Sequence, residues 1–352
     1  MKKIKVNFST GSHSTGRGIG FYSSNLAAAL KSLPNISLTD KNPDINHYPY
    51  FDLFYPTLRP DPLTLTVVTI HDLTPLMLPH FYPKGIKGRL NLHKQKQSLK
   101  LIAAVITDSQ NSKQDIISKL GIPAEKIHVT PLAVDPIYAK PVSDKHLQEV
   151  KQKYSLPDQF VLYVGGVNPN KNLPRLIRAT DSLKVPLVFV GSEFTKPTPV
   201  PTSFRARIGL QSTHPELKDL HFIKKAITHY PHISALGFVD NSDLAAIYRL
   251  ASLYCQPSIY EGFGLPVLEA MSAGCLIVSS NSSSLPEIYP QETITFDPHS
   301  HRSLTKALKK ALSLNHNEKL KLIKSGQKRA KDFSWKNTAE LTAQVYSTVL
   351  NP

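Results

Sequence analysis

The sequence predicts an α/β protein with two doubly wound parallel sheets, one in each of two domains. Short continuous apolar runs alternate with amphipathic segments of helical length along the whole chain, as in parallel strands covered by helices on both faces. The alternation occurs in two sets, and 352 residues is the usual length of two domains. Residues 139–159 are polar, contain proline and lack a strand. We therefore place one domain at 1–140 and the other at 141–333, with a C-terminal helix at 334–352 that crosses back to the first.

The first half begins with a strand at 4–8, which leads through a glycine loop at 16–20 into a helix that ends near residue 33. The other expected elements of this half are strands at 65–70, 104–107 and 127–130 and a helix at 112–120. In the second half we expect strands at 160–164, 187–190, 235–239, 253–257 and 276–279, and helices at 173–183, 217–230, 244–250 and 265–273. Helices at 303–314 and 317–331 follow, and a last helix runs to residue 350 after Ser334, a suitable N-cap.

Residues 260–270, YEGFGLPVLEA, carry the most informative pattern in the chain. Two carboxylates, Glu261 and Glu269, bracket a glycine-containing loop and the start of a short helix. Pro266 suits the first helical position, where a missing N–H is harmless. Gly274 is a suitable left-handed cap at the other end.

The start of this helix is expected to bind an anion, because it combines unpaired N–H groups with a partial positive charge. The backbone N–H groups of Phe263, Gly264 and Leu265 can approach a phosphate or a sugar closely, since glycine has no Cβ in the way. Glu261 and Glu269 repel phosphate but suit hydroxyl groups beside it. A sugar nucleotide carries hydroxyls on both sides of its diphosphate and fits this pattern.

The composition is strongly basic, with a net charge of +16 and a pI near 9.6. The charge is dispersed and no nucleic-acid motif is present, so we expect no nucleic-acid partner. The densest basic segment, 84–100, predicts either a surface helix with a solvated basic side, which we favour, or a helix on an anionic membrane. No signal peptide is visible and no apolar run approaches the ~20 residues of a membrane span. We therefore expect a cytoplasmic protein, with the inner face of the membrane as an alternative location, and buried free thiols at Cys255 and Cys275.

With these motifs together, the chain resembles retaining glycosyltransferases of the GT-B fold, in glycosyltransferase family 4 or group 1, over essentially its whole length. The strongest element is the E-x7-E motif from Glu261 to Glu269. The other matching landmarks, in family order, are Gly18-Ile19-Gly20, Thr69-Ile70-His71-Asp72-Leu73, Val105-Ile106-Thr107-Asp108-Ser109, Tyr163-Val164-Gly165-Gly166, Lys171-Asn172-Leu173 and Ser284-Leu285-Pro286-Glu287.

The resemblance implies two Rossmann-like domains with a cleft between them, the nucleotide-sugar donor mostly on the C-terminal one and the acceptor on the N-terminal one. It implies that Glu269 binds the ribose hydroxyls and that Glu261 contacts the donor sugar. It further implies that Lys171 neutralises the departing diphosphate and that His71 contacts the donor sugar or its transferred centre. His71, Lys171, Glu261 and the 16–20 loop each follow a predicted strand, and ligands of open α/β sheets bind at that edge.

The chain departs from the family pattern near the diphosphate. Many relatives carry an arginine either just after the strand glycine or just before the lysine, where this chain has Gly166 and Asn170. We expect Arg17, in the glycine loop with Gly18 and Gly20, to supply the missing charge.

Asp72 follows His71 directly in the sequence. A carboxylate beside a histidine can fix the ring's orientation. We expect Asp72 to orient the ring of His71 or the loop that carries it.

The predicted reaction moves a hexosyl unit from a nucleoside diphosphate sugar, with GDP-mannose favoured by the resemblance, to a glycan or a polyprenyl-linked acceptor. No pair of carboxylates with the spacing of a retaining glycosidase is evident, so we expect a front-face displacement that retains configuration. No cofactor or metal is expected: the sequence lacks Asp-x-Asp, and Lys171 and the helix N-terminus supply positive charge to the leaving group. The alternatives are a sugar-phosphate synthase of the same fold and a non-catalytic basic module that binds membrane or nucleic acid. A dehydrogenase is disfavoured because the 16–20 loop lacks G-x-G-x-x-G spacing.

Overall fold

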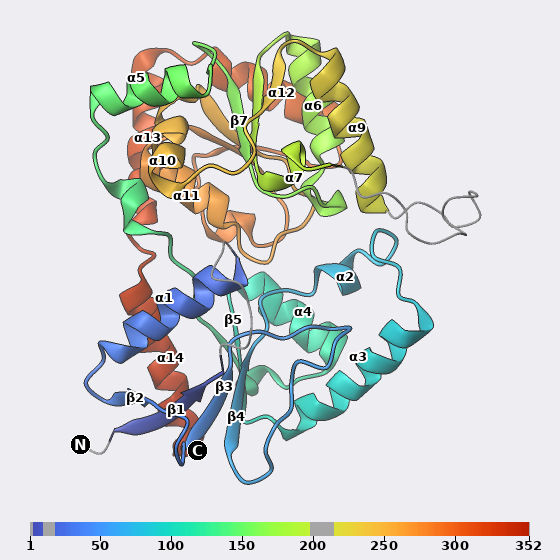
Figure 1. The fold of residues 1–352 in the computed structure, drawn as a ribbon, viewed down its shortest axis with the longest axis vertical. Helices are drawn as coiled ribbons and strands as arrows, with labels where there is room; N and C mark the ends of the chain where they lie inside the picture. The colour runs from blue at the N-terminus through green and yellow to red at the C-terminus, as the bar shows by residue number, and fades with distance from the viewer. Residues whose placement is uncertain (1–2, 10–17, 198–214, 352) are drawn as a thin grey trace. The chain divides into compact units, whose positions relative to one another are not determined.

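The computed structural model describes residues 3–9, 18–197 and 215–351, and for residues 215–217 it describes the backbone alone. The chain divides into two compact units, each described here by itself. One comprises Met1–Val134 with Phe333–Pro352, and the other comprises Asp135–Asp332. Each unit contains a six-stranded parallel sheet with helices packed around it (Figure 1), which is the α/β architecture that the sequence predicts. The boundary lies at Asp135, whereas the sequence placed it at residue 141.

The sheet of the first unit has the order β2-β1-β3-β4-β5-β6, and every neighbouring pair is parallel. Its strands are β1 (Ile4–Phe8), β2 (Ile36–Leu38), β3 (Ile45–Tyr48), β4 (Leu65–Thr69), β5 (Ala104–Thr107) and β6 (Ile127–Val129). The sequence does not predict β2 or β3, because they are three and four residues long and include polar side chains.

The helices of the first unit are α1 (Ile19–Lys31), α2 (Thr74–Met77), α3 (Ile86–Ser98), α4 (Gln110–Leu120) and α14 (Trp335–Leu350), with the 3-10 turns η1 (Leu99–Leu101) and η2 (Ala124–Lys126). The last helix, α14, starts at Ser334, whose side chain accepts a hydrogen bond from the backbone N–H of Asn337, so the predicted N-cap is confirmed. α14 packs along α1 and thereby completes the first unit with residues from the far end of the sequence (Figure 1).

The sheet of the second unit has the order β12-β11-β10-β7-β8-β9. Its strands are β7 (Val161–Val164), β8 (Leu187–Val190), β9 (Ile233–Ala235), β10 (Leu253–Gln256), β11 (Ile277–Ser280) and β12 (Ile294–Phe296). β9 ends where the sequence expects that strand to start, and β12 is not predicted because it is short and lacks a continuous buried run.

The helices of the second unit are α5 (Asp144–Lys153), α6 (Leu173–Leu183), α7 (Ser192–Thr195), α9 (Pro215–His229), α10 (Asn241–Leu250), α11 (Leu265–Ala273), α12 (His301–Leu312) and α13 (His316–Ala330), with the turns η3 (Pro136–Ala139), η4 (Pro169–Lys171) and η5 (Leu285–Glu287). Four of the helices expected from apolar periodicity, at 173–183, 244–250, 265–273 and 303–314, are present within a few residues of their expected ends.

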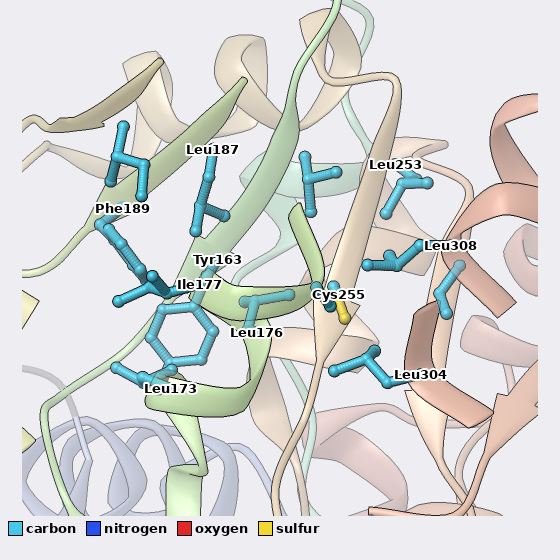
Figure 2. Packing of buried hydrophobic residues seen from close by; sticks show 14 of the residues in the cluster. Tyr163, Leu173, Leu176, Ile177, Leu187, Phe189, Leu253, Cys255, Leu304 and Leu308 are labelled. Carbon is cyan, nitrogen blue, oxygen red and sulfur yellow. The ribbon is translucent and has the colours of Figure 1, made fainter. Parts of the chain in front are cut away.

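One face of the second sheet is packed by apolar side chains from α6 and α12. Figure 2 shows Tyr163 and Phe189 from the strands, with Leu176 from α6 and Leu308 from α12 in the same cluster. Cys255 is a buried free thiol in this core. The packing holds the strands rigid, so the loops at their ends start from fixed positions.

Within the residues that the structure describes, no helix is both long enough and apolar enough to cross a membrane.

Candidate functional site

The order of the second sheet reverses between β7 and β10, which are neighbours although β8 and β9 lie between them in the sequence. Loops that leave the carboxyl ends of two such strands diverge and leave room for a ligand. Lys171 ends the turn η4 after β7, and Glu261 lies in the loop after β10. The topology thus brings two of the predicted site residues to one edge of one sheet.

Lys171 and Glu261 form an ion pair. The Lys171 Nζ lies 2.8 Å from both carboxylate oxygens of Glu261. Their side chains are 19% and 10% exposed, so water screens the pair much less than it would a surface pair. The two groups that the sequence assigns to a diphosphate and to a sugar hydroxyl hold one another in this structure.

Further donors fix the carboxylate of Glu261. Its Oε1 accepts hydrogen bonds from Gln256 Nε2 at 2.8 Å and from Ser258 Oγ at 2.6 Å. Its backbone N–H donates to Ser283 Oγ at 2.8 Å, and its carbonyl accepts from Ser284 Oγ at 2.9 Å. Oε1 is therefore saturated by three donors, whereas Oε2 contacts Lys171 alone within the described residues. A ligand hydroxyl is best placed to reach Oε2.

Tyr254 orients the ion pair indirectly, through Gln256. Its hydroxyl donates to the side-chain oxygen of Gln256. Burial raises the pKa of Tyr254, and the neighbouring Tyr163, Glu261 and Glu269 raise this pKa further. Tyr254 thus stays a neutral donor, and both motif glutamates lie close enough for their charges to act on it.

Helix α11 begins immediately after this loop. Its N-cap, Gly264, has φ +121°, and a Cβ there would lie 2.7 Å from a methyl carbon of Leu285. The N–H groups of Gly264 and Leu265 have no acceptor among the described residues, so the predicted donors at these two positions are present. Phe263 is buried, and Ser284 Oγ donates to its carbonyl at 2.8 Å.

The ends of α11 match the expected signals closely. Pro266 is the second helical residue rather than the first, because the helix starts at Leu265. Gly274 adopts the left-handed conformation with φ +79°, as predicted for the C-terminal cap.

Glu269 lies about one turn into α11 and is half-buried. The hydroxyl of Tyr248, from the neighbouring helix α10, donates to Glu269 Oε2 at 2.9 Å. Burial, followed by the charge of Glu269, raises the pKa of Tyr248, so this donor is permanent. A carboxylate fixed in this way is suited to accept hydrogen bonds from a pair of ligand hydroxyls.

The resemblance implies an arginine at one of two positions, and both positions, Gly166 and Asn170, pack closely against neighbouring groups in this structure. The side chain of Asn170 donates to the carbonyl of Tyr260 at 2.9 Å, and the N–H of Ile259 donates to the carbonyl of Asn170 at 2.7 Å. A Cβ at Gly166 would lie 3.1 Å from Glu193 Oε2. Asn170 therefore fastens the loop after β7 to the loop after β10, which positions Lys171 against Glu261.

In the first unit, His71 follows β4 and has two acceptors. Its Nδ1 lies 2.8 Å from Asp108 Oδ2, and its Nε2 lies 3.2 Å from the carbonyl oxygen of Pro49. Burial lowers the pKa of His71, but the charge and hydrogen bond of Asp108 outweigh that effect, so the pKa is raised overall. Two roles were expected for Asp72, to orient the ring of His71 or to orient the loop that carries it. The structure shows the second: Asp72 Oδ1 accepts a hydrogen bond from the N–H of Thr74 at 2.7 Å.

The glycine loop of the first unit is described only from Gly18 onward. Gly18 is the N-cap of α1 with φ +79°, and Gly20 is buried in the first turn of that helix. Arg17 lies outside the described residues, so its expected role in supplying positive charge stays a prediction.

No role was assigned from the sequence to four residues that shape these two sites, namely Gln256, Ser258, Tyr248 and Asp108, although Asp108 stands in one of the family landmarks. Gln256, Ser258 and Asp108 each stand at the end of an apolar strand, where a polar residue is unusual and lies at the ligand-binding edge. That position was a usable signal. Tyr248 lies within a helix and gives no signal that separates it from a core tyrosine.

Comparison with known sequences places both halves of the chain in one class of protein. The family described as "Glycosyl transferases group 1" matches residues 145–329, and the family "Glycosyltransferase Family 4" matches residues 8–137.

Two relatives from Escherichia coli bear the names of mannosyltransferases. O-antigen chain mannosyltransferase B is 32% identical over 314 residues, which is 88% of this chain and 76% of that protein. The serotype-specific mannosyltransferase WbdA is 30% identical over 290 residues, 81% of this chain, but the chain spans only 34% of WbdA's length.

Among solved structures, sucrose-phosphate synthase from Thermosynechococcus elongatus aligns over 99% of both chains with a TM-score of 0.72 at 17% identity, a likeness of fold. Its architecture agrees with the two parallel sheets described above. The two family matches, the fold and the paired glutamates of the E-x7-E motif together show that the chain belongs to the group 1 glycosyltransferases of family 4, with the GT-B fold.

Proposed function

We propose that this protein transfers a mannosyl unit from GDP-mannose to a hydroxyl group of a glycan or a polyprenyl-linked saccharide, with retention of configuration and without a metal ion. The observation that carries this proposal is the Lys171–Glu261 pair at the start of α11. The sugar is chosen because the relatives at 30–32% identity are named mannosyltransferases.

In this reaction Lys171 and the N-terminus of α11 stabilise the leaving group. When the anomeric carbon leaves the nucleoside diphosphate, negative charge develops on a phosphate oxygen. Fixed N–H groups and a cation aimed at that oxygen lower the barrier without reorganisation. The N–H groups of Gly264 and Leu265 and the ammonium group of Lys171 are such groups. We propose that the lysine moves from Glu261 to the diphosphate when the donor binds, which frees the carboxylate for sugar hydroxyls.

The hydrogen bonds of Glu261 support the proposed retention of configuration by front-face displacement. A carboxylate nucleophile needs an oxygen directed at the anomeric carbon, and retaining glycosidases place a second carboxyl group about 5 Å away. The Oε1 atom of Glu261 already accepts three hydrogen bonds. Glu261 is thus built to hold hydroxyl groups in place rather than to form a covalent intermediate.

Nucleotide recognition is assigned to Glu269. Its carboxylate is held by Tyr248 on one oxygen, and carboxylates are good acceptors for the two hydroxyls of a ribose. We place the ribose beside α11 and the sugar beside Glu261, with the diphosphate between them at the helix N-terminus.

A donor panel tests this proposal. The protein is mixed with GDP-mannose, UDP-glucose, UDP-N-acetylglucosamine and dTDP-rhamnose, and binding is followed by thermal shift; a donor at 100 times its Kd stabilises the fold by about 2.7 kcal/mol. GDP-mannose is expected to give the largest shift. Lys171→Met is expected to weaken it, whereas Lys184→Met, which removes an exposed ion pair to Asp181, is expected to leave it unchanged. No shift with any donor would contradict the proposal.

Acceptors separate the proposed reaction from its alternatives. Nucleotide release is measured with mannosyl oligosaccharides, with polyprenyl-linked saccharides and with hexose phosphates as acceptors. Turnover confined to hexose phosphates would instead indicate a sugar-phosphate synthase. Binding of donor without turnover on any acceptor would indicate a non-catalytic module.

We also propose that α3 rests on an anionic membrane. Its inner face is hydrogen-bonded to the rest of the first unit. Gln95 is buried, and its side-chain amide donates to the backbone carbonyls of Asp52 at 2.7 Å and Tyr55 at 2.8 Å. Its outer face presents Ile86 and Leu90, one turn apart and 81% and 60% exposed.

The charged residues of the segment that carries this outer face are all basic. Residues 84–100 contain six lysines and arginines and no acid. Partial burial lowers the pKa of Lys84, and the charges of Lys96, Arg89 and Lys119 lower this pKa further, which shows how densely the cations are placed. Aliphatic side chains ringed by cations suit an anionic lipid surface, where each lysine adds about 1 kcal/mol.

Vesicle co-sedimentation tests the membrane contact. The protein is expected to bind vesicles that contain phosphatidylglycerol and not vesicles of phosphatidylcholine alone. The double variant Ile86→Asn/Leu90→Asn is expected to lose this binding, and Leu320→Asn, at an exposed leucine of the second unit, is expected to keep it. Equal binding of both variants would contradict the assignment to α3.

A further inference from the structure

Among the described residues of the first unit, the buried His47 and the partly buried His71 have hydrogen-bond partners that differ in kind. His47, on β3, lies between two hydroxyl groups: its Nδ1 is 2.6 Å from Tyr346 Oη and its Nε2 is 2.8 Å from Thr69 Oγ1. A hydroxyl group can donate or accept, so a neutral ring satisfies both contacts. Burial, followed by the charge of His71, lowers the pKa of His47 to about 3.

His71 lies between two groups that can only accept. Asp108 offers a carboxylate oxygen to Nδ1, and Pro49 offers a backbone carbonyl oxygen to Nε2. A neutral imidazole has one N–H, so with an ionised Asp108 one ring nitrogen would turn its lone pair toward an oxygen. Both contacts of the ring can be hydrogen bonds only when the His71–Asp108 pair carries one additional proton. That proton lies either on the ring or on the carboxyl group.

The ordinary acidities of the two groups place the proton on the ring. Imidazolium is a weaker acid than a carboxyl group by more than two pKa units. Burial raises the pKa of Asp108, and the charge and hydrogen bond of His71 only partly offset this effect. The charge of the 3% exposed carboxylate is little screened and raises the pKa of His71 as well, so the ordinary gap between the two groups still leaves the proton on the ring. The other groups that face the ring are Tyr22 from α1, whose ring makes an edge contact at 4.6 Å, His47 from β3 and Asp72 beside it. Asp72 supports the positive charge, and His47 is neutral.

A second observation concerns Asp108 itself. Its Oδ1 is buried and has no hydrogen-bond partner among the described residues. A buried carboxylate oxygen without a donor costs stability, so this residue is not explained by folding alone. Its other oxygen is committed to His71.

We propose that Asp108 is a positioning residue that keeps His71 doubly protonated at neutral pH, so that His71 acts as a fixed cation and not as a base. A doubly protonated ring has no lone pair. In the proposed transfer reaction, on which this part of the inference rests, His71 therefore cannot take the proton of the acceptor hydroxyl.

Nuclear magnetic resonance of ring-labelled histidine tests the charge state without any substrate. The signals of His71 are assigned by their loss in His71→Gln, and the full chain is titrated from pH 5 to pH 9. At pH 7 the two ring nitrogens of His71 are expected to have the nearly equal shifts of imidazolium, while His47 shows a neutral ring. In Asp108→Asn, His71 is expected to be neutral at pH 7.5. A neutral His71 ring at pH 7 in the unmodified protein would overturn the proposal.

The pH profile of transfer tests the role of Asp108. Asp108→Asn is expected to lose kcat, with KM little changed, and to lose more at pH 7.5 than at pH 6. If the ring reverts to its ordinary pKa of 6.5, about a tenth stays protonated at pH 7.5, which is a loss of roughly tenfold. Asp108→Glu, which keeps the charge, is expected to restore the unmodified profile in part. An equal loss at both pH values would indicate a merely structural role and overturn the assignment. Absence of any transfer would count against the proposed function and leave the magnetic resonance result to decide the charge state.

Discussion

The ammonium nitrogen of Lys171 lies 2.8 Å from both carboxylate oxygens of Glu261, although the two residues are 90 positions apart in the chain. Each neutralises the other at the edge of the second sheet. Removal of either charge leaves its partner partly buried without an opposite charge, which is more damaging than the loss of both.

We expect Lys171→Met to lower the free energy of unfolding by about 3 kcal/mol, since the buried carboxylate of Glu261 then loses its opposite charge. The double variant Lys171→Met/Glu261→Gln is expected to recover part of that loss, because no unpaired charge remains. Urea unfolding of the two single variants and the double variant measures the coupling. Strictly additive losses would show that the pair does not contribute as a unit.

Gly264 is expected to tolerate no side chain. Gly264→Ala places a Cβ 2.7 Å from Leu285 at a φ of +121°, which combines steric overlap with backbone strain. A destabilisation of about 2–4 kcal/mol is expected from the two effects together, together with loss of the thermal shift given by GDP-mannose. Gly18→Ala is the matched control: φ is also positive there, but among the described residues beyond its chain neighbours no atom lies within 4 Å of the added carbon, so only the strain is expected. Equal losses would mean that contact with Leu285 is unimportant.

Stability should fall as the solution is acidified, because His47 resists protonation in the folded state. Its pKa is about 3 in the fold and 6.5 in its absence. Between these values the unfolded chain binds a proton that the folded chain does not, so folding loses up to about 1.4 kcal/mol per pH unit as the pH decreases. Denaturant unfolding from pH 7 to pH 4 measures this slope. In His47→Gln the slope should decrease by the contribution of about one proton taken up on unfolding. An unchanged slope in His47→Gln would assign the acid sensitivity to other groups.

Donor binding should depend on the hydroxyl of Tyr248. Tyr248→Phe removes the 2.9 Å hydrogen bond to Glu269, and a bond to a charged group contributes about 1.5–3 kcal/mol. We expect GDP to bind roughly tenfold more weakly, as measured by calorimetry. Tyr138→Phe, which removes a hydrogen bond to Asn241 in the same unit, should bind GDP normally. Weaker binding in both variants would point to a general loss of order.

Transfer is expected to proceed without a divalent cation, because Lys171 and the N–H groups at the start of α11 provide the positive charge for the leaving group. Nucleotide release should be the same with excess chelator and with added Mg²⁺ or Mn²⁺. A loss with chelator that either metal restores would contradict this prediction.

The sequence predicts the architecture well where strands are continuous and apolar, as at β7 and β8, because burial on both faces leaves a direct mark on composition. It fails at β2, β3 and β12, which are three or four residues long and contain polar side chains. Such strands are defined by their neighbours in the sheet, and a single sequence does not contain that information.

The candidate site shows the same division. The motif and the strand pattern predict that Lys171 and Glu261 lie at one edge, but not that they are bonded to each other, because that depends on how Asn170 ties the two loops together. The sequence left open whether Asp72 orients the ring of His71 or the loop that carries it, and the structure shows the loop. Successive residues of an extended segment point in opposite directions, and the carboxylate that contacts the ring, Asp108, comes from the end of the next strand.

The hydrogen bond between His47 and Tyr346 joins residues 299 positions apart. The first unit needs α14 to cover its sheet, whereas the second unit is one uninterrupted stretch. During synthesis, Asp135–Asp332 can therefore fold while strands β1 to β6, which are translated earlier, still lack α14. The imidazole of His47 and the neighbouring strands cannot pack against α14 until Tyr346 has left the ribosome. The first unit, although most of it is translated first, therefore completes its folding last.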